Sequence, residues 1–169
     1  MGFKEVKADE LQFNPFRKIF REWMLVTAGN KEQYNTMTAS WGGLGITWNK
    51  RTATIYVRPQ RYTKQFIDAN DYFTLSFFDE TYRNALNICG SVSGRDDPDK
   101  ATKAGLTPLY IDNTTAFNEA NMILVCCKLL HTELQQDNFE LESIIKSSYP
   151  DKDFHTLYIA EIVKVLVKE

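Results

Sequence analysis

A chain of 169 residues is about the length of one domain and can bury a core without disulfides or metal ions, so a single domain over 1–169 is expected. Hydrophobic residues make up 43% and charged residues 25%, and the net charge of −2 gives no general attraction to nucleic acid or to an anionic membrane. No segment approaches the roughly 20 apolar residues of a membrane-spanning helix, and charges interrupt the first residues, where a secretory signal would be apolar. Three cysteines without a pairing pattern favour free thiols and a cytoplasmic location.

Short runs rich in β-branched and aromatic residues follow one another along the chain and end at Gly, Asn or Pro. The strands predicted from these runs cover residues 23–28, 36–41, 52–57, 72–78, 121–130 and 155–167. Three short helices are expected between them, over 63–69, 81–88 and 98–104, the last with Asp97 as its cap and Gly105 after its end. Because strands outnumber helices, the sequence predicts a mainly β fold, a closed or split antiparallel barrel with a few short peripheral helices.

The second predicted strand lies in the run YNTMTASW at 34–41. Alternation along a strand sends small polar side chains to one face and a more apolar set to the other. The polar set is Thr36, Thr38 and Ser40, beside Asn35, and the apolar set is Met37, Ala39 and Trp41. Such a polar face would offer donors and acceptors to a flat ligand, whereas the alternative is a surface strand with solvated threonines.

Three cations and no acid occur in the run RPQRYTK at 58–64, after the third predicted strand. Thr63 stands where a helix is expected to begin, so its hydroxyl and the first free N–H groups would converge on one spot and attract a phosphate. Arg58 and Arg61 would add bidentate hydrogen bonds to that anion. The alternative is an exposed basic turn.

A glycine- and serine-rich loop, CGSVSGRDDPDK at 89–100, follows the second predicted helix. Its two glycines allow the backbone to wrap around the edge of a ligand, and Ser91, Ser93 and Arg95 could contact that ligand. The alternative is a solvated loop that ends in a capped helix.

No metal site is expected, because the two histidines, His131 and His155, are far apart and no Cys/His cluster has ligand spacing. The run GGLG at 42–45 has the wrong spacing for a dinucleotide-binding loop and no helical pattern follows it. A nucleophile elbow and a phosphate-binding P-loop are also missing from the sequence. His155, at the head of the last predicted strand, either faces a pocket or is a structural residue.

Five blocks of the sequence, taken together, resemble the flavin reductase-like family. They are NTMTASWGGLG at 35–45, YVRPQRYT at 56–63, YFTLSFF at 72–78, CGSVSGRDDPDK at 89–100 and FHTLYIAEIVKVLV at 154–167. The resemblance runs from about residue 14 to the end, with the blocks in family order. It implies an FMN-binding split barrel with Greek-key-like antiparallel strands, and a homodimer with FMN near the subunit interface.

The resemblance also implies a role for each block. Residues 35–41 would lie beside the isoalloxazine ring, and 58–63 would hold the phosphate and the ribityl chain. Ser91, Ser93 and Arg95, with Lys100, would close the site, and His155 would lie where nicotinamide docks. The implied cofactor-binding residues are Asn35, Thr36, Met37, Thr38, Ala39, Ser40, Trp41, Arg58, Gln60, Arg61, Tyr62, Thr63, Ser91, Ser93, Arg95 and Lys100. The run 97–99 is one residue longer than in the family pattern.

Three hypotheses about function follow. The first is an enzyme, an NAD(P)H-dependent flavin reductase, in which the cofactor carries out the hydride chemistry and the protein binds and orients it. The second is an electron-transfer flavoprotein of the flavoredoxin type, which takes electrons from a protein partner. The third is a non-catalytic barrel that binds a flat ligand.

Overall fold

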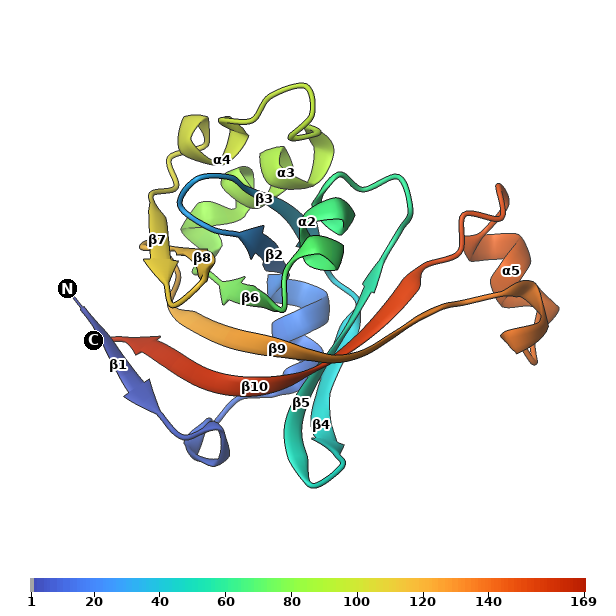
Figure 1. Ribbon diagram of the computed structural model, residues 1–169, viewed down its shortest axis with the longest axis horizontal. Coiled ribbons are helices and arrows are strands. Elements are labelled where there is room, and N and C mark those ends of the chain that lie inside the picture. The colour runs from blue at the N-terminus through green and yellow to red at the C-terminus, as the bar shows by residue number, and fades with distance from the viewer. Residues whose placement is uncertain (1) are drawn as a thin grey trace.

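The structure, a computed structural model, describes residues 2–169 and consists mainly of antiparallel β-sheet with short helices around it (Figure 1). The strands are β1 Phe3–Val6, β2 Met24–Gly29, β3 Tyr34–Ala39, β4 Gly42–Thr47, β5 Lys50–Val57, β6 Tyr72–Phe77, β7 Pro108–Ile111, β8 Thr114–Phe117, β9 Met122–Glu133 and β10 Thr156–Lys168. The α-helices are α1 Pro15–Arg17, α2 Thr63–Ala69, α3 Arg83–Ser91, α4 Lys100–Lys103 and α5 Glu142–Ser148. Single 3-10 turns cover Ala8–Glu10, Glu80–Tyr82 and Gln136–Asn138, and a π-helical turn covers Lys18–Glu22. The predicted fold class is confirmed.

Connectivity explains why the main sheet curls into a barrel. Its strand order is β3-β2-β6-β9-β10-β5-β4, and β1 pairs with the end of β10. β3 and β4 stand at opposite ends of this order, yet only Ser40 and Trp41 connect them. Since each residue advances the chain by at most about 3.8 Å, the two ends of the sheet must lie within about 11 Å of each other. The sheet therefore closes around its own inner face, and the link Ser40–Trp41 lies at the seam.

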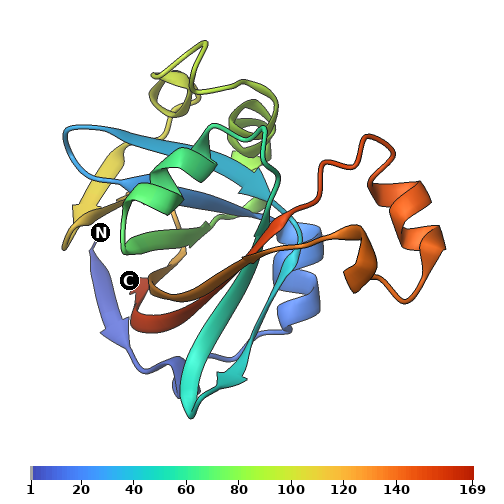
Figure 2. The same ribbon diagram turned by 45° about the vertical axis from the view of Figure 1, so that its right-hand side comes forward.

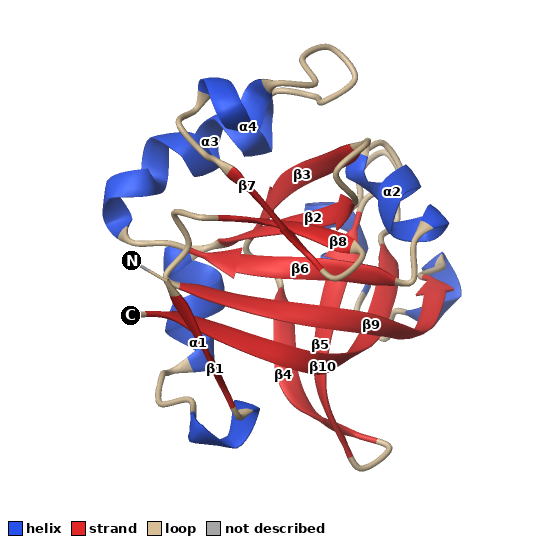
Figure 3. Cartoon of the chain, turned by 60° about the vertical axis from the view of Figure 1, so that its left-hand side comes forward, coloured by secondary structure: helices blue, strands red, loops and turns tan. Residues whose placement is uncertain are grey.

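Two hydrophobic clusters cover the two faces of the sheet. Val26 of β2 and Ile55 of β5, which stand far apart in the strand order, belong to the same inner cluster. Leu25, the neighbour of Val26, packs in the outer cluster with Leu86 of α3 and Phe117 of β8. Both faces of β2 are buried because α3 and the β7–β8 hairpin lie over the outer face (Figure 3). This double coverage explains why all six residues of β2 are buried and why its sequence does not alternate between apolar and exposed polar residues.

Residues 134–155 between β9 and β10 form an arm that carries α5. The arm projects from the barrel in two views (Figures 1 and 2). Its outer apolar side chains are exposed, Leu141 by 60% and Ile144 by 42%. The two ends of the described chain meet on the other side of the barrel, where Glu169 N donates to Gly2 O at 3.1 Å.

The six predicted strands are all present, with ends shifted by no more than three residues. β1, β4 and the β7–β8 hairpin were not predicted. Three glycines among the six residues of β4 hide its strand pattern, and β1 and the hairpin strands have only four residues each. The predicted helix over 98–104 was too long, since α4 spans only Lys100–Lys103. Asp97 is not its cap: its Oδ1 accepts from Asp99 N and pairs with Lys103 in the turn before the helix.

Gly105 ends α4 as expected, with a positive φ of +86° that favours glycine. Over residues 2–169, the longest apolar helical stretches fall short of what a membrane crossing by a helix requires. All three cysteines are free thiols, as predicted, and the neighbours Cys126 and Cys127 of β9 differ in burial because alternate residues of a strand point to opposite faces.

Candidate functional site

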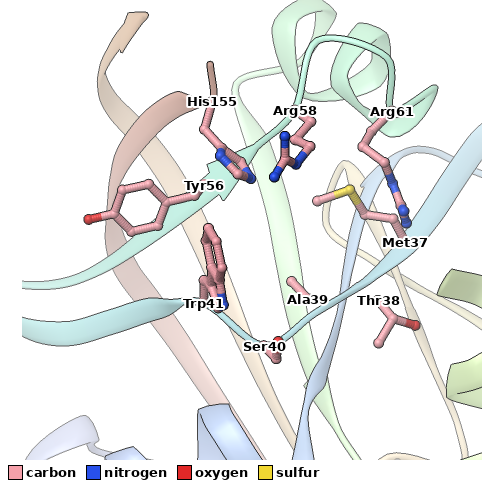
Figure 4. A pocket seen from close by; sticks show the side chains of 9 residues that line it. All are labelled: Met37, Thr38, Ala39, Ser40, Trp41, Tyr56, Arg58, Arg61 and His155. Atoms are coloured by element: carbon pink, nitrogen blue, oxygen red, sulfur yellow. The ribbon is translucent and has the colours of Figure 1, made fainter. Parts of the chain in front are cut away.

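Two cavities lie side by side at the seam, where the β3–β4 link meets the β5–α2 loop. The first, called the aromatic cavity, has a volume of about 190 Å³ and is drawn in Figure 4. Its lining residues are Met37, Thr38, Ala39, Ser40, Trp41, Tyr56, Arg58, Arg61 and His155. The second, called the basic cavity, has about 90 Å³ and is lined by Asn35, Met37, Gln60, Arg61, Tyr62, Thr63, Gly90, Ser91, Val92, Ser93, Gly94 and Lys100. Met37 and Arg61 line both, so the two cavities adjoin each other.

The side chains of β3 alternate as predicted, but the two threonine hydroxyls of the expected polar face are bonded within the protein. The hydroxyls of Thr36 and Thr27 lie 2.8 Å apart in the core, and Thr36 is 1% exposed. The hydroxyl of Thr38 donates to the carbonyl of Leu86 in α3. Figure 4 shows Thr38 pointing away from the space that Met37 and Ala39 enter. The prediction that the threonine hydroxyls are free for a ligand is therefore wrong, because the hydroxyl of Thr36 is bonded to β2 and that of Thr38 to α3.

Arg58, predicted to face an anion with no acid nearby, is paired with a carboxylate from the arm. Its guanidinium donates to Asp153 Oδ2 and, at 2.8 Å, to the carbonyl of Ser148. Gln60 Nε2 donates to the same carboxylate oxygen at 2.8 Å. These hydrogen bonds lower the pKa of Asp153. Arg58 thus fastens the arm to the barrel and is only partly available to a ligand.

Two other cations in the site have no carboxylate partner within residues 2–169. Arg61 donates to the carbonyl of Gly90 at 3.0 Å, and burial lowers the pKa of its guanidinium, which stays charged at neutral pH. Lys100 is 3% exposed and donates to the carbonyls of Cys89 and Val92 at 2.8 and 2.7 Å. Burial lowers the pKa of Lys100 to about 8. The basic cavity therefore holds uncompensated positive charge, which suits an anion.

The start of α2 is less open than predicted. Lys64 N donates to Arg61 O and Gln65 N donates to Tyr62 O, so two of the first amide groups are used within the turn. Thr63 is 1% exposed, and its hydroxyl accepts from Asn35 Nδ2 at 2.9 Å. Thr63 and Asn35 thus join β3 to α2 beneath the basic cavity.

The glycine-rich loop approaches β3 very closely. A Cβ atom placed on Gly94 would lie 1.9 Å from Asn35 Oδ1, and one placed on Gly90 would lie 3.2 Å from Thr38 Cβ. Ser91 Oγ donates to the carbonyl of Asn87, and Ser93 Oγ accepts from Arg95 N. Only a residue without a side chain fits at position 94, so the loop packs tightly against β3 there.

His155 is 6% exposed and lines the aromatic cavity between two aromatic rings. Its ring centroid lies 5.3 Å from that of Trp41 and 6.3 Å from that of Tyr56. The Nδ1 atom lies 2.8 Å from the hydroxyl oxygen of Tyr149. Burial, and next the positive charge of Arg58, lower the pKa of His155 to about 4, although Asp153 acts in the opposite direction. The imidazole is therefore neutral at physiological pH.

Of the residues predicted for the site, all but Thr36 and Arg95 line one of the two cavities. Thr36 is in the core, and the Arg95 guanidinium lies 4.9 Å from the ring centroid of Tyr62, outside the basic cavity. The prediction missed Tyr56, Gly90, Val92 and Gly94 as lining residues. Alternation in the strand 52–57 could have assigned Tyr56 to a face, but no local pattern marks the approach of Tyr149 or Asp153. Within residues 2–169, no group of three or more metal-ligating side chains converges.

Fold and site together define an antiparallel split barrel with two cavities at its seam, whose lining suits a small ligand with a flat part and an anionic part. Residues 16–169 match the family described as "Flavin reductase like domain", and the chain belongs to this family. A search of curated proteins finds no match.

Solved structures share the fold at low sequence identity. An FMN-binding domain of a flavin reductases-like enzyme from Shewanella baltica OS155 is 17% identical, with a TM-score of 0.70 over 98% of this chain and 76% of the other. Flavoredoxin of Desulfovibrio vulgaris (Miyazaki F) is 21% identical, with a TM-score of 0.68 over 98% and 76%. A Streptomyces globisporus NADH:FAD oxidoreductase, solved with NAD and FAD fragments, is 15% identical, with a TM-score of 0.65 over 87% and 74%.

The residues of the site fit a flavin nucleotide. Trp41, Tyr56 and Met37 offer flat or deformable apolar contacts for a ring, and Arg61 and Lys100 supply the positive charge that a phosphate needs. Each cavity is smaller than the roughly 300–1,000 Å³ of typical sites for small molecules. However, the aromatic cavity shares Ser40, Trp41 and Tyr56 with an apolar groove of about 790 Å³ on the outside of the barrel. A ligand of that size must span both cavities and reach toward the groove.

Proposed function

We propose that this protein binds FMN at the seam of the barrel and works as an oxidoreductase that transfers hydride or electrons between NAD(P)H and the flavin. The observation that carries the proposal is the pair of adjoining cavities, one aromatic and one holding two cations without carboxylate partners. Family membership supports the flavin. In this proposal residues 1–169 act as one flavin-binding domain, and the cytoplasmic location stays a prediction.

The proposed roles of the residues follow from their positions. Arg61, with Lys100 behind the loop 90–94, would hold the phosphate, and Asn35 and Thr63 would form the floor of that cavity. The backbone of the link 39–41 and the rings of Trp41 and Tyr56 would hold the flat part of the cofactor. When bound, FMN supplies the hydride chemistry, so the protein needs no nucleophile or general base of its own.

An absorbance spectrum of the purified protein, before and after desalting from excess FMN, tests the cofactor. We expect oxidised flavin bands that stay with the protein and that bleach when NADH or NADPH is added without oxygen. Bands that bleach only with a reduced protein donor would favour the flavoredoxin-type alternative. A folded protein that stays colourless after the FMN soak would contradict the proposal.

We further propose that a second copy of the chain covers the apolar groove and with it the aromatic cavity. The groove runs between the α1 region, β4 and the arm, and its rim holds Phe16 and Phe20, which are 82% and 60% exposed. So large an exposed apolar surface next to a ligand site is typical of a protein interface. A homodimer is also what the family resemblance implies, and its closure would complete the walls of the site.

Replacing Phe16 and Phe20 together by serine is expected to convert the protein from dimer to monomer and to weaken FMN binding, because the groove loses its apolar rim. Light scattering after size exclusion measures the mass. Tyr110→Ser is the matched control, since Tyr110 is 50% exposed on β7, on the opposite side from the arm in Figures 1 and 2. A wild-type protein that is monomeric at micromolar concentration, with and without FMN, would contradict the dimer.

A further inference from the structure

Tyr149, at the end of α5, lies outside the predicted site and contacts one of its residues directly. Its hydroxyl oxygen lies 2.8 Å from His155 Nδ1, and both side chains are buried, Tyr149 at 4% and His155 at 6% exposure. Within residues 2–169, this hydroxyl has no other hydrogen-bond partner. Its proton therefore has one acceptor available, the lone pair of Nδ1.

We propose that Tyr149 is a positioning residue that holds His155 in the tautomer with its proton on Nε2, so that a neutral N–H donor lines the aromatic cavity. The group it would serve is the carbonyl oxygen of a flat ligand next to the flavin, such as the carboxamide of a nicotinamide. This inference rests on the proposed function, because that function supplies such a ligand.

A neutral imidazole has one donor and one acceptor nitrogen, and the hydrogen bond at one of them decides the other. If Tyr149 donates to Nδ1, the proton of the ring must be on Nε2. Nε2 has no partner within residues 2–169, and the ring lines the aromatic cavity. The resulting Nε2–H donor makes no hydrogen bond within residues 2–169 and can therefore donate to a ligand.

The charged and titratable groups that face His155 come from two sides. The β5–α2 loop contributes Arg58, and the arm contributes Asp153 and Tyr149 itself, while Trp41 and Tyr56 enclose the ring without charge. Burial raises the pKa of Tyr149, which keeps its hydroxyl protonated at neutral pH. With His155 neutral over the same pH range, the direction of the hydrogen bond is the same throughout.

The tyrosine ring is held independently of its hydroxyl. The Arg58 guanidinium carbon lies 5.2 Å from the centroid of the Tyr149 ring, and the rings of Phe154 and Phe139 lie 4.9 and 5.4 Å away. Replacing Tyr149 by phenylalanine therefore removes the hydrogen bond and leaves the packing. The variant Tyr149→Phe therefore tests the hydrogen bond separately from the packing of the ring.

The direct test is long-range ¹H–¹⁵N NMR of the imidazole nitrogens in the FMN-loaded protein. The chain has only two histidines, and His131 is exposed and serves as an internal reference. In the wild type we expect the His155 pattern of a proton on Nε2, unchanged from pH 8 down to about pH 5. In Tyr149→Phe we expect a mixture of tautomers, and an NADH KM raised about 3- to 10-fold, the loss of one hydrogen bond, with FMN affinity changed less than twofold.

Tyr158→Phe is the matched control, because its buried hydroxyl donates to Asp68 instead and should leave both readouts as in the wild type. A wild-type His155 with its proton on Nδ1 would overturn the inference, and so would a Tyr149→Phe protein with an unchanged tautomer and KM. Wild-type protein that fails to bind FMN would instead refute the proposed function, and the tautomer can still be read in that protein.

Discussion

Arg61→Ala is expected to weaken FMN binding by about 1.5–3 kcal/mol, roughly the contribution of hydrogen bonds to a charged group. Arg61 lines both cavities, and within residues 2–169 no carboxylate neutralises it. Its guanidinium is anchored by the carbonyl of Gly90, which leaves other N–H groups for a phosphate. Fluorescence titration of the apoprotein with FMN measures the change, which corresponds to a Kd about 10- to 160-fold higher.

A control variant and a second ligand separate this effect from a general loss of charge or fold. Arg51→Ala removes an arginine from the other end of β5, where it pairs with Asp9 on the surface, and should leave the Kd unchanged. Arg61→Ala should also bind riboflavin, which lacks the phosphate, as well as the wild type does. An equal loss of affinity for riboflavin and FMN would contradict a phosphate contact at Arg61.

Gly94→Ala is expected to lower the free energy of unfolding by about 1–3 kcal/mol, as overpacking does, and to weaken FMN binding at the same time. The new methyl group would lie 1.9 Å from Asn35 Oδ1, so the loop or the amide must move. Asn35 is 4% exposed and donates to Thr63, so its displacement breaks the contact that joins β3 to α2. Urea denaturation and the same FMN titration measure the two effects.

The cause of the Gly94→Ala effect can be isolated with a second substitution. Asn35→Ala removes the amide that the methyl group would strike, so the double variant should lose less stability than the sum of the two single variants. Gly45→Ala is the matched control, because a Cβ there meets nothing within 4 Å. Additive losses in the double variant would show that the strain arises elsewhere in the loop.

Much of the fold was predictable because the residues of its longest strands by themselves favour a strand. β6 is a run of mostly aromatic and β-branched residues, β9 begins with a long apolar run, and the helix Thr63–Ala69 was predicted with its observed ends. β4 was missed because its stability comes from pairing with β5 across a tight hairpin, not from its own glycine-rich residues. Strand propensity is a property of the single residue, whereas the pairing of two strands also depends on the residues of the partner strand.

The candidate site, like the fold, was predictable from the sequence in part, and the rest of it depends on the tertiary structure. Sequence by itself determined which segments line the two cavities, because the polar run at 35–41, the basic loop at 58–64 and the glycine-rich loop at 89–100 are each local in sequence. It also determined that the family is flavin reductase-like, since five such blocks occur in order. These features need no knowledge of what packs against them.

Only the tertiary structure decided which atoms in those segments are free. Asp153 reaches Arg58 from 95 residues away, and α3 uses the hydroxyl of Thr38, so two groups that look available in the sequence are already bonded. Arg61 and Lys100 meet backbone carbonyls instead and keep their charge unpaired. The physical reason is that a hydrogen bond or ion pair depends on distances of a few ångströms, and chain closure at the seam sets those distances.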